Sequence, residues 1–141
     1  MNPCQRDTTM KNSEVLRARD VMSRKVVYVD GMATAKQAAE LMRRENTDAL
    51  IVSKRDEDDA YGIVAVKDLI RTVVVTDMDS TAVNVFEMMT KPVIPVPAGM
   101  DVRYVVRLLM RADMRRAPVE ENGEFVGMVS LSSLILDNLL F

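Results

Sequence analysis

The side chains that most often carry catalysis or hold metals are scarce in this chain of 141 residues. There is no histidine, which removes His-based triads, His general bases and His metal ligands. The single cysteine, Cys4, stands in a polar N-terminal segment, so disulfide frameworks and cysteine-rich zinc sites are excluded within one chain. The five glycines are scattered singly and form no phosphate-cradling loop. We therefore expect a protein that is not an enzyme and requires no cofactor and no metal.

The charge and hydropathy of the chain argue against nucleic acid and membranes as partners. A net charge of −2, from 19 basic and 21 acidic residues, gives no electrostatic case for nucleic acid or an anionic membrane. No window approaches 18 uninterrupted apolar residues, and the N-terminus does not resemble a secretory signal, so we expect a cytoplasmic protein. The arginines that could contact DNA stand among acids and lack aromatic stacking partners; they are Arg43, Arg44, Arg111, Arg115 and Arg116.

The elements that must position any site occur twice. Asp20-Val21-Met22-Ser23 aligns with Glu87-Met88-Met89-Thr90, and Gly62-Ile63-Val64 aligns with Gly127-Met128-Val129 after a longer turn in the first copy. Such self-similarity indicates one supersecondary unit used twice, each copy covering the apolar face of the other. We predict a mobile tail over 1–13, a first repeat over 14–75, a linker over 76–81 and a second repeat over 82–141.

Each copy is expected to contain a short strand, a helix, two antiparallel strands and a closing helix, which gives an α+β fold class. In the first copy, the strand covers 25–29, Thr34 caps the helix, the paired strands cover 48–53 and 61–66, and 68–75 closes the copy. In the second copy, Asp101 caps the helix, the paired strands cover 115–120 and 125–131 around an Asn122-Gly123 turn, and 132–140 closes. Short helical patterns precede the copies at 14–21 and 82–88. Val73-Val74-Val75 suits a strand as well as a helix.

The chain contains twelve methionines, several of them on predicted apolar faces. Methionine fills irregular gaps in cores and at subunit interfaces, which is favoured here over metal binding by thioethers. Repeats of this size leave helix faces exposed, so we expect a homodimer formed through the helices.

Together these features resemble a tandem pair of CBS domains, named after cystathionine beta-synthase, from about Arg19 to Leu136. The resemblance rests on the Asp20–Ser23 motif, the strand ending near Ala117-Pro118-Val119 and the run from Gly62 to Leu69. It implies a Bateman module: two β-α-β-β-α units, packed pseudo-symmetrically and commonly dimerised, with up to two clefts for AMP, ADP, ATP, S-adenosylmethionine or related adenosyl ligands.

The resemblance also implies a role for Asp68, which ends the family's Gly-x-x-Ser/Thr-x-x-Asp motif. A carboxylate can accept two hydrogen bonds from the vicinal hydroxyls of a ribose, and such charge-assisted bonds are strong. The alternative is that Asp68 only caps the closing helix. Ala65 stands at the motif's Ser/Thr position, so one hydroxyl contact is lost and binding is expected to be weaker.

Two clefts follow from this resemblance, each mixing residues of both copies. The stronger is expected to join Ala65, Lys67, Asp68, Thr90, Val93, Ile94, Met114, Arg115, Arg116, Ala117 and Pro118. The weaker is expected to join Ser23, Val26, Val27, Thr47, Asp48, Ala49, Leu50, Ser130 and Ser133. In the weaker cleft Ser133 replaces the ribose-binding Asp, and Asp48 stands where the second copy has Arg115, so a phosphate would meet negative charge. Arg115 and Arg116 could equally form a solvated edge.

Two functions remain open at this stage. The first is a non-catalytic regulatory module for energy sensing, which binds an adenine nucleotide or related adenosyl ligand and modulates an unidentified regulated protein or its own assembly. The alternative is a ligand-free association module with degenerate clefts, favoured by Ala65 and Ser133 and opposed by Asp68 with the two arginines.

Overall fold

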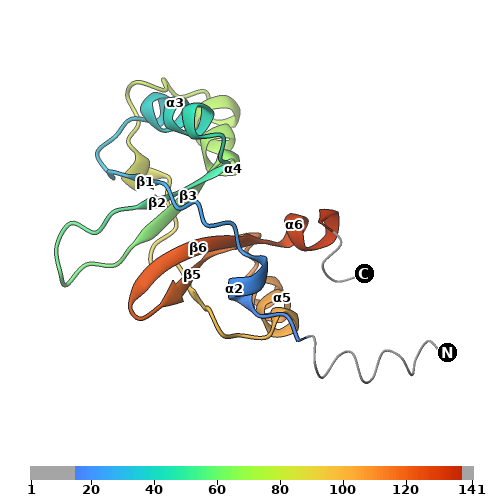
Figure 1. Cartoon of the computed structure of the whole chain (residues 1–141). Helices are drawn as coiled ribbons and strands as arrows, with labels where there is room; N and C mark the ends of the chain where they lie inside the picture. The colour runs from blue at the N-terminus through green and yellow to red at the C-terminus, as the bar shows by residue number, and fades with distance from the viewer. Residues whose placement is uncertain (1–14, 138–141) are drawn as a thin grey trace. The chain divides into compact units, whose positions relative to one another are not determined.

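The computed structural model describes residues 15–137. The predicted tail over 1–13, with Cys4, and the last residues of the predicted helix over 132–140 lie outside the described residues. The chain divides into two compact units (Figure 1). Residues 26–94 form the first, here called the central unit, whereas 15–25 and 95–137 together form the second, the terminal unit.

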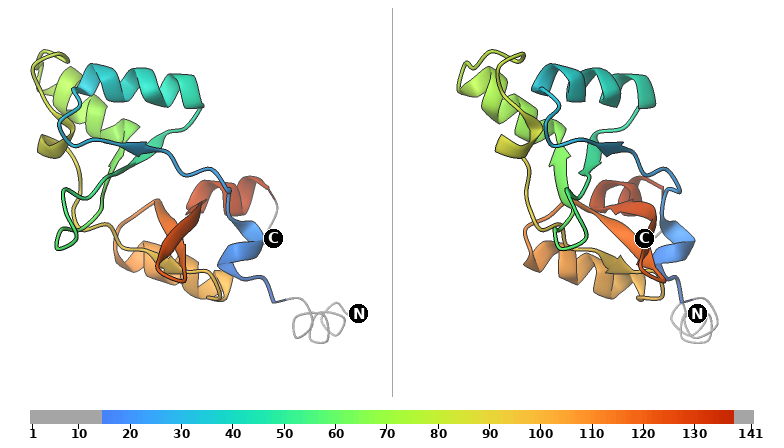
Figure 2. Two further views of the ribbon diagram at one scale, coloured as in Figure 1. Left: turned by 60° about the vertical axis from the view of Figure 1, so that its left-hand side comes forward. Right: turned by 90° about the vertical axis from the view of Figure 1, so that its left-hand side faces the viewer.

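The central unit is a three-stranded sheet covered on one face by helices (Figure 2). The strand order is β1-β2-β3, with β1 parallel and β3 antiparallel to β2. Its elements are β1 (Tyr28–Val29), α3 (Ala35–Glu45), β2 (Ala49–Val52), β3 (Gly62–Ala65), α4 (Val66–Leu69), a π-helix η1 (Ile70–Val75) and a 3₁₀-helix η2 (Val85–Glu87).

The terminal unit repeats this plan. Its sheet has the order β4-β5-β6, again with one parallel and one antiparallel pairing. Its elements are α2 (Ala18–Val21), β4 (Val96–Pro97), α5 (Val102–Arg111), β5 (Arg116–Glu121), β6 (Glu124–Ser130) and α6 (Leu131–Leu136). The predicted α+β fold of two repeated units is therefore confirmed.

The predicted helix caps are present. Thr34 Oγ1 accepts a hydrogen bond from the Gln37 N–H at 3.1 Å, and Gln37 Oε1 accepts one from the Thr34 N–H at 2.9 Å. This reciprocal pair satisfies two backbone donors at the start of α3. Asp101 caps α5 by accepting a hydrogen bond from the Arg103 N–H at 2.9 Å. Both caps fix the helices so that their apolar faces pack on the sheets.

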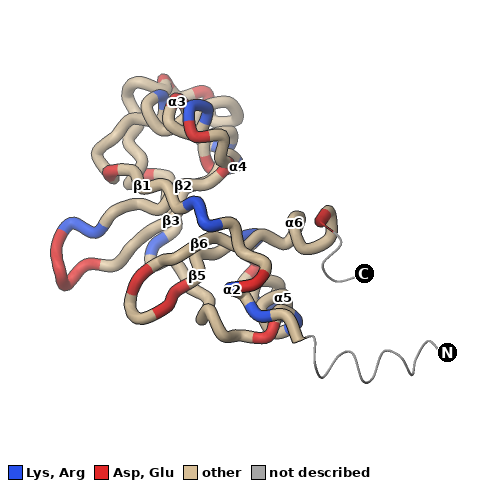
Figure 3. Tube along the Cα trace, viewed as in Figure 1, with Lys and Arg blue, Asp and Glu red and all other residues tan. Residues whose placement is uncertain are grey.

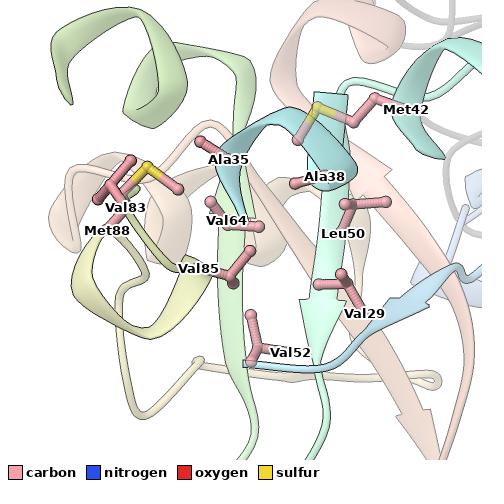
Figure 4. Packing of buried hydrophobic residues seen from close by; sticks show 10 residues of the cluster. All are labelled: Val29, Ala35, Ala38, Met42, Leu50, Val52, Val64, Val83, Val85 and Met88. Atoms are coloured by element: carbon pink, nitrogen blue, oxygen red, sulfur yellow. The ribbon is translucent and has the colours of Figure 1, made fainter. Parts of the chain in front are cut away.

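Each unit has its own hydrophobic core. Figure 4 shows the central one, where Ala38 and Met42 of α3 lie over Leu50 of β2 and Val64 of β3. In the terminal unit, Val105 and Leu109 of α5 are buried against β5 and β6. The two residues of each pair are four positions apart, which places them on one side of the helix.

Each unit also contains the opening segment of the other repeat. Ser23 belongs to the first repeat by sequence, yet its N–H and C=O both pair with Met128 at 2.8 Å in the terminal unit. Thr90 pairs in the same way with Ile63 at 2.9 Å in the central unit. Ala18 and Val85 are fully buried in the corresponding cores. The sequence repeats and the compact units therefore have different boundaries.

Several elements differ from their predicted extents. The first strand contains only Tyr28 and Val29. The short helical patterns predicted at 14–21 and 82–88, here called the lead-in segments, contain four residues of α-helix and three residues of 3₁₀-helix. The closing segment of the first copy begins at Val66 and widens into a π-helix at Ile70, where the Thr76 N–H reaches the Arg71 carbonyl at 3.1 Å. The valines over 73–75 are therefore neither regular α-helix nor strand.

Candidate functional site

Asp68 lies at the third position of α4, directly after β3. Its Oδ2 atom accepts a hydrogen bond from the Ala65 N–H at 2.8 Å, so the carboxylate does cap the helix. Its Oδ1 atom is 3.5 Å from Arg71 Nη1, and the side chain is 18% exposed. A carboxylate has more acceptor sites than these two contacts use. Capping and ligand binding are therefore compatible at this residue.

Thr90 is placed beside β3 by backbone pairing with Ile63, and the next turn brings the Val93 N–H to the Tyr61 carbonyl at 2.9 Å. The side chain of Thr90 is exposed, whereas that of Val93 is 7% exposed. The central unit thus supplies one part of the predicted stronger cleft, consisting of Ala65, Lys67, Asp68, Thr90, Val93 and Ile94.

The terminal unit contains the remaining residues of that set, at the start of β5. Arg115 is exposed just before the strand, and its carbonyl accepts from the Leu131 N–H at 2.8 Å. Arg116 begins the strand opposite Ser130 and is half-buried. Ala117 belongs to the hydrophobic core, so its side chain is not available to a ligand. Met114 is half-buried and Pro118 is buried.

The predicted weaker cleft divides in the same way. In the terminal unit, Ser130 Oγ caps α6 by accepting from the Ser133 N–H at 3.2 Å, and Ser133 Oγ donates to the Ser130 carbonyl at 3.1 Å. Ser23 is exposed beside Met128. In the central unit, the Asp48 carbonyl accepts from the Val66 N–H at 3.0 Å, and Thr47 Oγ1 donates to the Ala49 carbonyl at 3.1 Å.

Three other members of this set also lie in the central unit. The Val27 carbonyl accepts from the Ile51 N–H at 2.9 Å, and Val26 is half-buried. Leu50 is fully buried in the core, so its side chain packs α3 and is not available to a ligand. The predicted roles of both residue sets in binding stay predictions.

Sequence reasoning missed an ion cluster next to Thr90. The Asp59 carboxylate contacts Lys91 Nζ at 2.7 Å and Arg55 Nε at 3.0 Å, and its side chain is only 7% exposed. The hydrogen bond from Arg55, and then that from Lys91, hold the pKa of Asp59 far below its usual range. The spacing of Arg55 and Asp59 was visible in the sequence, but the contact with Lys91 required the fold. This cluster fastens the β2–β3 loop to the segment that follows Thr90.

The low pKa of Asp59 predicts how the free energy of unfolding changes in acid. A depressed folded-state pKa adds stability that is fully present above the unfolded value, near pH 4, and is lost as the pH falls through the folded value. Asp59→Asn should therefore lower the free energy of unfolding at pH 7, and this deficit should shrink steadily below about pH 4. Urea denaturation at a series of pH values measures this difference.

The matched control for this prediction is Asp58→Asn, which removes the same charge from the same exposed loop but leaves Arg55 and Lys91 on Asp59. We expect it to change the free energy of unfolding little at any pH. A constant deficit for Asp59→Asn between pH 7 and pH 3 would show that the cluster does not set the acid response.

The sequence profile of the CBS domain family matches residues 18–75 and 85–136, which include both lead-in segments and both closing helices. The chain belongs to the CBS domain family. Its two segments make it a tandem CBS protein, as the resemblance implied.

Named relatives agree with this assignment. The uncharacterized protein MK0525 of Methanopyrus kandleri is 28% identical over 117 residues, which cover 82% of this chain and 59% of that protein. The chain thus spans less than two thirds of that relative's length. The hexameric CBS-CP12 protein from bloom-forming cyanobacteria is 36% identical, with a TM-score of 0.83 over 86% of this chain and 67% of that chain.

The CBS domain pair of protein MJ0100 shares the fold at 19% identity. Its TM-score is 0.72, over 89% of this chain and 95% of that chain, and its crystal structure is a complex with 5′-methylthioadenosine and S-adenosyl-L-methionine. Over residues 15–137, no three His, Cys, Asp or Glu side chains are grouped so that they could hold a metal ion. None of the helices in that range is long and apolar enough to cross a membrane.

Proposed function

We propose that this chain is a non-catalytic regulatory module that binds an adenosyl ligand and thereby modulates a partner protein or its own assembly. The observation that carries the proposal is the turn from β3 into α4, where Asp68 is held by one short hydrogen bond beside Ala65. A carboxylate fixed in this manner keeps acceptor capacity for the two hydroxyls of a ribose. Gly62 and Asp68 have the spacing of the first and last residues of the family's Gly-x-x-Ser/Thr-x-x-Asp motif, which supports a ribose-binding role for Asp68.

The proposal assigns the phosphates of a nucleotide to Arg115 and Arg116, because guanidinium groups offer forked donors that match phosphate oxygens. It assigns a further polar contact to Thr90. If AMP and ATP bind with different affinities, the module would report cellular energy. The adenosyl ligands in the MJ0100 complex make S-adenosyl-L-methionine and 5′-methylthioadenosine natural probes beside AMP, ADP and ATP.

Isothermal titration of the full chain with these five ligands tests the proposal. We expect one of them to bind and Asp68→Ala to weaken it by about tenfold to a hundredfold, the size of a lost hydrogen bond to a charged group. Asp58→Asn is the matched control and should bind as the wild type does. Arg115→Ala should weaken a phosphorylated ligand more than 5′-methylthioadenosine, which carries no phosphate.

Absence of binding to any of the five ligands at millimolar concentration would overturn the adenosyl proposal. Equal binding by Asp68→Ala and the wild type would instead reject the role of Asp68. Because Asp68 also caps α4, circular dichroism must show that the variant is folded. Asp68→Asn provides a second check, since an amide can still accept from the Ala65 N–H but carries no charge.

The second candidate is a ligand-free association module. It is favoured by the exposed apolar side chains of η1, where Ile70, Val74 and Val75 are 49%, 70% and 74% exposed. Such side chains suit a homodimer formed through the helices. Sedimentation equilibrium of the wild type and Val74→Lys distinguishes the two candidates: a dimer that Val74→Lys dissociates, together with no ligand binding, supports association alone.

A further inference from the structure

A pocket of about 310 Å³ lies in the central unit, at the end of β3 opposite to Asp68. It opens where β2 runs into the loop that leads to β3, the loop seen projecting in Figure 1. Its walls are formed by Tyr28, Ser53, Lys54, Asp56, Glu57 and Tyr61.

Two aromatic rings form one side of this pocket. The ring centroids of Tyr28 and Tyr61 are 6.0 Å apart and the rings are tilted by 54°, a favourable arrangement for an aromatic pair. Lys54 Nζ lies 5.2 Å from the centroid of the Tyr61 ring, so one ring already contacts a cation. The side chain of Tyr28 is 42% exposed.

Two acidic residues also line the pocket. Asp56 and Glu57 both line the pocket, against the single ammonium of Lys54. Figure 3 shows the acidic residues gathered at the tip of this loop beside a short basic stretch. Arg55 is not a lining residue: its guanidinium is bonded to Asp59 and attracts Asp56 only through the electrostatic field. The lining charge therefore favours a cationic guest.

The loop is held in place before any guest arrives. Asp59 fastens it through Arg55 and Lys91, and Asp56 Oδ1 accepts from the Asp58 N–H at 2.9 Å. A site that is already ordered loses less entropy on binding.

The residues that line this pocket are not repeated in the second copy. In the aligned second repeat, Pro95 stands for Tyr28 and Val126 stands for Tyr61. The acidic loop is replaced there by a tight turn in which Asn122 and Gly123 have φ values of 54° and 81°. Nothing in the repeated β-α-β-β-α plan requires two tyrosines and two carboxylates at this corner. The two tyrosines and two carboxylates are therefore candidates for a function separate from the fold.

We propose that this pocket docks an arginine side chain presented by a partner protein. A guanidinium can stack on the exposed ring of Tyr28 while its forked N–H groups pair with the carboxylate of Asp56 or Glu57. The volume is at the lower end of the range for small-molecule sites, about 300–1,000 Å³, which suits one side chain. The site does not depend on the adenosyl ligand proposed above.

Titration of the ¹⁵N-labelled full chain with the peptide acetyl-Gly-Arg-Gly-amide, followed by NMR, tests the inference. We expect saturable amide shifts concentrated at residues 28, 53–57 and 61. Peptides with lysine or citrulline in place of arginine separate the contributions of shape and charge: the citrulline peptide should bind at least about fivefold more weakly, as expected for a lost charge-assisted pair. Equal binding of the arginine and citrulline peptides would overturn the proposal.

Variants of exposed side chains locate the site. Tyr28→Ala should weaken the arginine peptide by about two- to fivefold and Tyr28→Phe should not, since the ring supplies the cation–π contact. Glu57→Gln with Asp56→Asn should weaken it further, whereas Glu124→Gln, an exposed carboxylate in the β5–β6 hairpin of the terminal unit, is the matched control. Shifts that are absent from the pocket, or unchanged in the double variant, would reject the docking site.

Discussion

Replacing Gly127 with alanine is expected to lower the free energy of unfolding by about 1–3 kcal/mol, the usual cost of forcing extra atoms into a packed interior. A Cβ at this position would lie 2.5 Å from both the sulfur of Met22 and the carbonyl oxygen of Ser23. The carbonyl cannot move without disturbing the hydrogen bond that it accepts from the Met128 N–H. Urea denaturation followed by circular dichroism measures the loss.

Two other glycines provide comparisons for the stability of Gly127→Ala. A Cβ on Gly62 would lie 2.9 Å from the Met89 sulfur and 3.2 Å from the Thr90 carbonyl, so Gly62→Ala should cost less than Gly127→Ala. Gly99→Ala is the control, because the nearest atom is the flexible end of Arg19 at 3.5 Å. Equal stability of the Gly127→Ala and Gly99→Ala variants would show that the lead-in segment is not tightly packed on β6.

Truncation of Leu50 to alanine is expected to cost about 2–5 kcal/mol, the range for a buried leucine that leaves a cavity. Leu50 is fully buried in the central core and lies beneath α3 (Figure 4). Such a loss is a large fraction of the total stability of a typical domain, about 5–15 kcal/mol. The variant should therefore unfold at clearly lower urea concentration.

The matched variant for Leu50→Ala is Leu109→Ala, which removes the same atoms from the core of the terminal unit. Hydrogen exchange then shows which amides lose protection in each variant. If the two units unfold separately, each variant should weaken protection in its own unit only; uniform loss throughout 15–137 would indicate a single cooperative transition. A cost below about 1 kcal/mol for Leu50→Ala would contradict its central place in the core.

Much of the fold could be predicted because the local signals are strong and occur twice. Thr34 and Asp101 each combine an N-cap residue with an apolar helical face, and Asn122-Gly123 supplies the positive φ values that a tight hairpin turn needs. The valines over 73–75 carried no such signal. Their β-branched side chains suit strand and helix alike, and the π-helix that they adopt depends on the Thr76 and Arg71 contact.

The candidate site was less accessible to sequence reasoning. The motif position of Asp68 could be read directly, and so could its capping alternative, because both follow from residues a few positions apart. The contact between Lys91 and Asp59 and the pairing of Ser23 with Met128 join segments distant in the chain. No local pattern encodes such contacts. The tyrosine pocket was missed for a similar reason, since Tyr28 and Tyr61 meet only after β1 and β3 flank β2.

The exchange of lead-in segments imposes an order of events during synthesis. The central unit uses one continuous stretch of chain, so it can close as soon as residue 94 has left the ribosome. The terminal unit must wait until β6 has emerged before Met22 and Ser23 can pack on Gly127. In the interval α2, with the apolar Ala18, lacks the complete core of the terminal unit. A nascent chain stalled between these two points should therefore be the species that chaperones capture.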